Sequence, residues 1–169
     1  PDSGSILFNR RGAATGSQSA NGDGVVNDDG VLNDGELAGV IFNHPREAQE
    51  MGISIIYQEF NLLPERTVAQ NIFLGREPTR RGMVDKRALQ RQTVKVLEQL
   101  DAQEMISPDA EVKTLSVAEQ QLVEIAKAIS LDARVLIMDE PTAALAADEV
   151  AMLTKLIGKL KARGLAVIF

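Results

Sequence analysis

The sequence predicts an α/β fold in which parallel strands alternate with helices. A continuous apolar run at 135–138 ends in two adjacent acids, Asp139 and Glu140, as is typical of a strand buried on both faces. An amphipathic helix is expected over 147–163, followed by an apolar strand at 165–169. This strand–helix–strand order predicts a right-handed crossover into a parallel sheet.

Composition narrows the class of protein. The chain has 169 residues, of which 44% are hydrophobic and 25% charged, enough for a globular domain with a real core. The net charge of −6 gives no support for a nucleic-acid partner. Cysteine is absent, which excludes disulfides and thiolate metal sites. Both ends look cut, so we expect a fragment of a longer protein.

Residues 1–44 are expected to form an antiparallel β hairpin. The strand candidates are 5–8 and 40–42. Between them, about residues 11–39 are rich in Gly, Asn, Asp and Ser, so they are interpreted as a polar insertion.

The insertion contains a candidate calcium loop. Asn27, Asp29, Asn33 and Glu36 fall where such a loop places oxygen ligands and its closing glutamate. The first position, normally Asp, is Val25. A second, overlapping register exists, and both cannot be filled. Ca²⁺ is therefore one candidate ligand, and a solvated acidic loop is the alternative.

Residues 45–62 are expected to form a helix and a strand. The helix begins at Pro45 and ends at Gly52, and the β-branched strand 53–57 leads directly to Gln58.

Residues 63–130 are expected to form an α-helical subdomain. Thr67 opens a helix through a capping box, and Asp85 can cap the next one. Ser116 and Glu119 form another capping box. The exposed N–H groups and the positive dipole end of that helix suit an anion such as phosphate; a plain capped helix is the alternative.

Residues 131–169 carry the acidic strand end. Ligands bind at the carboxyl ends of strands in open α/β sheets. Asp139 and Glu140 could there handle Mg²⁺ on a nucleotide phosphate and a water molecule. The alternative is a solvated strand end.

Taken together, Gln58, Leu115–Ser116 and 139–142 resemble the Q-loop, signature and Walker B motifs of ATP-binding subunits of ABC transporters. The segments 45–49, 56–62, 71–77 and 123–128 are similar to the subgroup that imports ribose, xylose or galactose. The resemblance implies a partial P-loop NTPase core, with an α-helical subdomain and a small antiparallel hairpin.

The resemblance also implies roles. Glu140 would be the catalytic residue that polarises the attacking water, while Asp139 and Gln58 would contact Mg²⁺. The residues implied to bind ATP are Gln58, Leu115, Ser116, Val117, Ala118, Glu119 and Asp139. The implied partners are a second ATPase domain, which would complete the site as a dimer, and transmembrane permease subunits, which would meet the helical subdomain. The expected location is cytoplasmic, on the inner face of the membrane.

Some family features are absent or altered. The phosphate loop should lie upstream of Pro1 and the switch histidine downstream of Phe169; His44 cannot replace the latter. We therefore expect the chain as given to bind ATP poorly and not to hydrolyse it. Val117, Ala118 and Glu119 stand where the family usually has Gly, Gly and Gln, which predicts a weakened signature.

Two other functions compete with sugar import. A non-transport ABC-type ATPase of the DNA-repair or chromosome type would insert a long coiled-coil arm, but the segment 58–115 is too short and lacks heptads. A calcium-binding module, with the α/β part as scaffold, is the other alternative.

Overall fold

The computed structural model describes residues 7–8, 38–39, 42, 44–143 and 145–169. The strands are β1 (Leu7–Phe8), β2 (Ala38–Gly39), β3 (Ile53–Ile56), β4 (Thr79–Arg80), β5 (Met83–Val84), β6 (Val135–Met138) and β7 (Ala166–Ile168). The helices are α1 (Pro45–Glu50), α2 (Val68–Ile72), α3 (Lys86–Gln99), α4 (Val117–Ile129) and α5 (Ala147–Ala162), with a 3₁₀ turn at Val112–Thr114. Within the described residues, no helix combines the length and apolarity needed to cross a bilayer.

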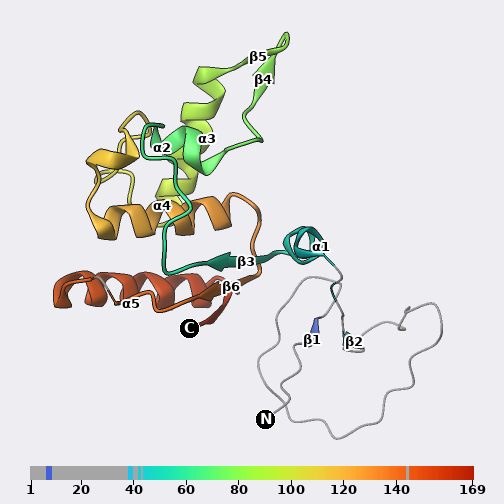
Figure 1. Cartoon of the computed structure of the whole chain (residues 1–169), viewed down its shortest axis with the longest axis vertical. Coiled ribbons are helices and arrows are strands. Elements are labelled where there is room, and N and C mark those ends of the chain that lie inside the picture. The colour runs from blue at the N-terminus through green and yellow to red at the C-terminus, as the bar shows by residue number, and fades with distance from the viewer. Residues whose placement is uncertain (1–6, 9–37, 40–41, 43, 144) are drawn as a thin grey trace, which may run out of the picture.

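The central element is a parallel sheet in the order β3-β6-β7. Helix α5 connects β6 to β7, so the predicted crossover and the α/β class are confirmed. The chain leaves β3 through the helical region, returns along α4 and enters β6 beside β3 (Figure 1). The carboxyl ends of β3 and β6 therefore lie side by side.

The two faces of this sheet differ in burial. Ile56, Leu136 and Met138 are at most 3% exposed and belong to one apolar core with residues of α4 and α5. Successive side chains of a strand point to opposite faces. On the other face Ile55, Ile137 and Ile168 are paired in register as a row across the three strands. In that row Ile55 is 49% and Ile168 45% exposed, so this row is open to solvent, whereas Ile53 and Val135 on the same face are buried.

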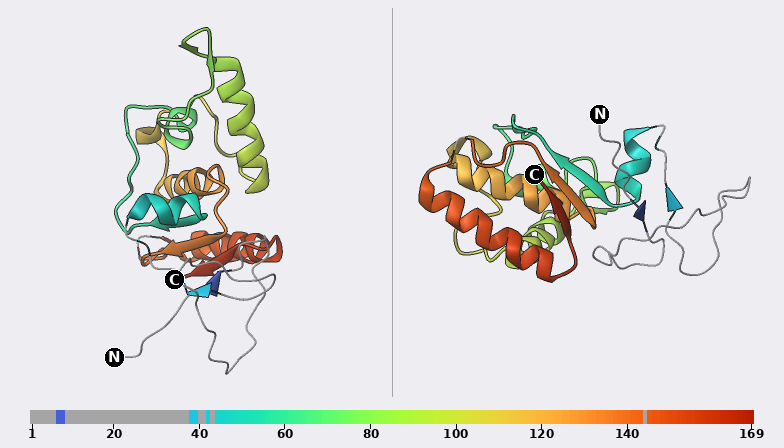
Figure 2. Two further views of the ribbon diagram at one scale, coloured as in Figure 1. Left: turned by 90° about the vertical axis from the view of Figure 1, so that its right-hand side faces the viewer. Right: turned by 90° about the horizontal axis from the view of Figure 1, so that it is seen from below.

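The helices α2, α3 and α4 pack into a lobe on one side of the sheet (Figures 1 and 2). The expected caps are present: Thr67 accepts a hydrogen bond from the Gln70 N–H, and Asp85 from the Ala88 N–H. Asn71, 1% exposed, holds the entry to the lobe. Its side chain accepts from the Leu63 N–H at 2.7 Å and donates to the Leu63 carbonyl at 3.0 Å.

The small hairpin pairs β1 with β2 in antiparallel register. This antiparallel pairing agrees with the expected hairpin topology. Of the strand expected at 40–42, only Phe42 is among the described residues, and it lies outside any strand. In the described register Leu7 pairs with Gly39 and Phe8 with Ala38.

Candidate functional site

The site is built around the end of β6. The Asp139 N–H donates to the Ile56 carbonyl at 3.0 Å, so β6 stays against β3 up to the acids. Glu140 then has φ of 44°, in the left-handed region that non-glycine residues rarely occupy. Such strain costs of order 1–3 kcal/mol and concentrates at functional positions. The turn directs the chain out of the sheet at the point where strand-end ligands bind.

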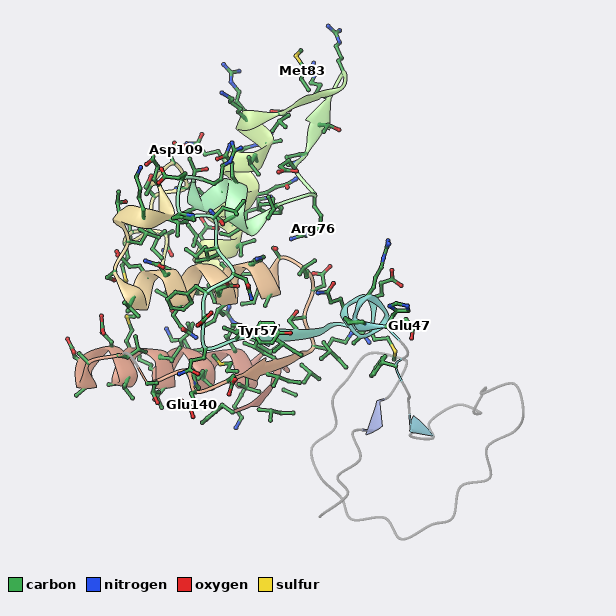
Figure 3. The ribbon with its side chains drawn as sticks, in the orientation of Figure 1. Glu47, Tyr57, Arg76, Met83, Asp109 and Glu140 are labelled. Atoms are coloured by element: carbon green, nitrogen blue, oxygen red, sulfur yellow. The ribbon has the colours of Figure 1, made fainter. Side chains whose placement is uncertain are left out.

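A cleft of about 390 Å³ opens beside this turn. Its walls come from the end of β3, the first turns of α4, and the segment after β6. The residues that line it are Gln58, Glu59, Phe60, Val117, Gln121, Glu140, Pro141, Ala143 and Leu145. The structure thus brings Gln58, Val117 and Glu140, which are far apart in sequence, to one cleft. Figure 3 shows Glu140 on the lower side of the chain, close to the sheet and α5.

The N-terminus of α4 carries the expected capping box. The Ser116 hydroxyl accepts from the Glu119 N–H at 3.3 Å, and the Glu119 carboxylate accepts from the Ser116 N–H at 2.7 Å. The carboxylate is therefore held back over its own helix end. The negative charge thus lies at the start of α4, where it would repel a phosphate bound to the same helix end.

The other predicted site residues lie next to the cleft without lining it. Asp139 is exposed and Leu115 is half-buried. The Leu115 carbonyl accepts a hydrogen bond from the Gln120 side-chain amide at 3.0 Å. Ala118 is only 6% exposed and faces the protein interior. Ser116 and Glu119 are engaged in the capping box.

Sequence reasoning missed Gln121. This side chain is 6% exposed and lines the cleft one turn after Val117, and it makes no hydrogen bond with any described residue. Among the described residues, every side-chain polar atom that is fully enclosed has a hydrogen-bonding partner. The Gln121 amide has no such partner among them, so it must be accessible from the cleft. The signal in the sequence was a glutamine placed on the face of α4 that also carries apolar residues.

A second missed feature fixes the segment after Gln58. The buried Glu124 carboxylate accepts from the Asn61 N–H at 2.7 Å, and the Lys127 ammonium donates to the Asn61 carbonyl at 3.1 Å. Both side chains lie on α4. The helix that begins at the capping box therefore also holds the backbone that leads away from Gln58.

The candidate calcium ligands Asn27, Asp29, Asn33 and Glu36 lie outside the described residues. Among the residues that are described, no group of three or more His, Cys, Asp or Glu side chains is arranged to hold a metal ion. A magnesium ion at the cleft would therefore need ligands beyond protein carboxylates, such as phosphate oxygens and water.

Comparison with known proteins gives consistent results. Residues 1–143 match the family model described as ABC transporter. The chain is 54% identical over 123 residues to the ribose import ATP-binding protein RbsA 1 of Rubrobacter xylanophilus, covering 73% of this chain and 24% of that protein. It is 44% identical over 136 residues to a putative ribose/galactose/methyl galactoside import ATP-binding protein of Agrobacterium fabrum, covering 79% and 27%. The chain thus spans about a quarter of the length of these relatives.

Solved structures show the same fold. An ATP-binding cassette of an ABC transporter in its ADP conformation is 24% identical, with a TM-score of 0.63 over 78% of this chain and 55% of that one. A dimeric cassette in a post-hydrolysis state bound to ADP and Pi is 23% identical, with a TM-score of 0.57 over 80% and 59%.

Proposed function

The chain belongs to the ABC transporter family, and on this premise we propose that it is part of an ATP-binding subunit that energises import of a ribose- or galactose-type sugar. One observation carries the proposal: Gln58 and Glu140 line the same cleft although 82 positions separate them. The names of the relatives from Rubrobacter and Agrobacterium support the sugar class.

The proposed chemistry is attack of water on the terminal phosphate of ATP. Phosphoryl transfer depends mainly on positioning and on neutralisation of charge. In the proposal Glu140 accepts a hydrogen bond from the attacking water, and the amide of Gln58 orients that water. The strained turn at Glu140 supports this role, because it fixes a carboxylate at the mouth of the cleft.

The residues present fit a magnesium ion. Asp139 offers carboxylate oxygens and Gln58 an amide oxygen, and Mg²⁺ prefers such hard ligands together with phosphate and water. When bound with ATP, the ion would supply neutralisation of the developing negative charge.

The start of α4 is proposed to bind the phosphates of a second ATPase domain. The dipole and the first-turn N–H groups of the helix favour an anion, whereas the Glu119 carboxylate, bound to the Ser116 N–H, opposes it. Val117 and Ala118 carry Cβ atoms where a closer backbone approach would need glycine, so we expect weaker binding than by a glycine-containing signature. The proposed assembly is a dimer whose helical lobes meet transmembrane permease subunits at the cytoplasmic face of the membrane.

The test is a Glu140→Gln substitution in the complete subunit that contains this chain. The variant keeps the shape of the side chain but not its charge, and we expect ATP hydrolysis to fall by about 10²-fold or more, while nucleotide binding is retained. Glu98→Gln, at an exposed position of α3, is the matched control and should hydrolyse ATP normally. Full hydrolysis by Glu140→Gln would refute the proposed role.

A further inference from the structure

The far end of the helical lobe carries a concentration of positive charge. The β4–β5 hairpin projects from the lobe, away from the sheet (Figures 1 and 2). Beside it, α3 begins at Lys86. We define the basic surface by six exposed side chains of this hairpin and helix: Arg80, Arg81, Lys86, Arg87, Arg91 and Lys95.

This charge is a local excess. Residues 76–95 contain seven basic and two acidic side chains, in a chain whose net charge is −6. None of the six residues of the basic surface forms an ion pair with another described residue. The nearby acid Asp85 is engaged as a helix cap, accepting from the Ala88 N–H at 2.9 Å. Asp109 also lies beside the surface, because its carboxylate accepts from the Gln90 amide of α3 at 2.9 Å. The six cationic side chains still outnumber these two acids, so the surface keeps an excess of positive charge.

The helical part of the surface points away from the lobe. Arg87, Arg91 and Lys95 follow each other at intervals of four residues, which places them on one face of α3. The opposite face carries Leu89 and Leu97, which are at most 6% exposed. An object that approaches this side of the lobe thus meets cationic side chains before any apolar part of α3.

The tip of the hairpin adds apolar side chains to the charge. Met83 is 73% exposed and Val84 49% exposed, and Figure 3 shows Met83 near the outermost point of the chain. Arg81 and Gly82 both have positive φ and form the tight turn that presents these residues. A single exposed methionine needs no explanation. Exposed apolar side chains that follow Arg80 and Arg81 on a projecting hairpin are, however, a combination that can enter the interfacial region of a membrane, as apolar and cationic side chains of interfacial helices do.

We propose that the β4–β5 hairpin and the outer face of α3 form a peripheral binding surface for membranes that contain anionic lipids. Cationic side chains gather at an anionic leaflet, and their aliphatic stems can accompany Met83 and Val84 into the interface. The cleft beside Glu140 and a second cleft beside Arg163 are both lined by other residues than those of the basic surface. A row of cationic side chains spread over a projecting hairpin and a helix face suits an extended layer of headgroups better than one small anion. This inference does not depend on the ATP chemistry proposed above.

The test is co-sedimentation of the chain with vesicles. Vesicles of phosphatidylcholine alone are compared with vesicles that also contain phosphatidylglycerol, at low and at high salt. We expect binding only to the anionic vesicles, with a marked decrease at 1 M salt, where the screening length is about 3 Å. The double variant Arg80→Glu/Arg81→Glu should bind on the order of tenfold or more weakly.

The matched control makes a charge change of the same size outside the basic surface. Lys155→Glu/Lys161→Glu alters two exposed lysines of α5 and should keep its vesicle binding. Circular dichroism checks the fold of each variant. If Arg80→Glu/Arg81→Glu does not fold, Arg87→Glu/Arg91→Glu is tested in its place. Equal binding to neutral vesicles, or an equal loss in the α5 control, overturns the proposal. Retention on immobilised polyglutamate without any binding to anionic vesicles would also overturn it and assign the surface to an acidic protein.

Discussion

Gln121 is a side chain that lines the cleft but makes no hydrogen bond to another described residue that would stabilise the fold. Its amide lines the cleft and has no hydrogen-bonding partner among the described residues. The amide is accessible from the cleft, so it is not an enclosed polar group. Water or a ligand in the cleft would supply the missing bonds.

We therefore expect Gln121→Leu to leave the free energy of unfolding unchanged or to raise it by up to about 1 kcal/mol, as measured by urea denaturation. Thr93→Val is the matched control, because the buried Thr93 hydroxyl donates to the Leu89 carbonyl at 2.9 Å. That variant should lose about 1 kcal/mol. A loss of stability in Gln121→Leu as large as in the control would show that the amide has a structural partner.

The sequence disclosed only part of the site at this scale. Gln58 and Glu140 could be predicted because each follows directly after an apolar strand, which is a local pattern. For Gln121 the sequence held only an indirect signal, a glutamine on an apolar face of α4, because its place in the cleft is defined by how α4 packs against the end of β3. The strained φ of Glu140 has no local signal, as a glutamate does not favour that conformation.

At the scale of elements, α4 connects two parts of the site. Its first turn carries the capping box, and two turns later Glu124 and Lys127 hold the Asn61 backbone. A displacement of α4 would therefore also displace the segment that follows Gln58.

Removal of the carboxylate should loosen this connection. We expect Glu124→Ala to lower the free energy of unfolding by about 1.5–3 kcal/mol, the range for a hydrogen bond to a charged group. Hydrogen exchange measured by mass spectrometry should show faster exchange at Asn61, because its N–H loses its acceptor. Lys113→Ala, which alters exposed ion pairs with Glu65 and Glu111, is the control, and exchange at Asn61 should there be unchanged.

Helix ends were the elements that the sequence predicted best. Thr67, Asp85 and Ser116 each cap the helix that was expected to begin after them, because a cap depends on residues three positions apart. The bounds of the second strand of the small hairpin stay a prediction, because most of the segment 40–42 lies outside the described residues. The basic surface was also missed, because the negative net charge conceals a local excess of the opposite sign.

For the molecule as a whole, exposed contacts link the helical lobe to the α/β core. Asp101, just after α3, pairs with Lys159 of α5, and the Arg163 guanidinium donates to the Gln99 carbonyl at 2.6 Å. The hydrogen bond from Lys159 holds the pKa of Asp101 below its usual value. A carboxyl group whose pKa is lower in the folded state stabilises that state above its unfolded pKa, and this contribution is lost as the pH falls through the folded pKa.

Acid should thus weaken the contact between lobe and core. We expect the stability of the chain to decrease as the pH falls below about 4, the ordinary pKa of an aspartate, and Asp101→Asn to reduce that decrease. Asparagine also tolerates the positive φ of this residue. Thermal melts from pH 6 to pH 3 measure the difference, and identical acid dependence in the two proteins would show that the ion pair has no part in it.

The row of Ile55, Ile137 and Ile168 has a practical consequence for every measurement on the isolated chain. Parallel sheets are ordinarily covered by other elements on both faces, whereas this row leaves apolar side chains exposed. Copies of the polypeptide can shield one another there, so apparent affinities would vary with protein concentration. Titrations of nucleotide or vesicles therefore belong at several dilutions, since only a value that is independent of dilution describes the single chain.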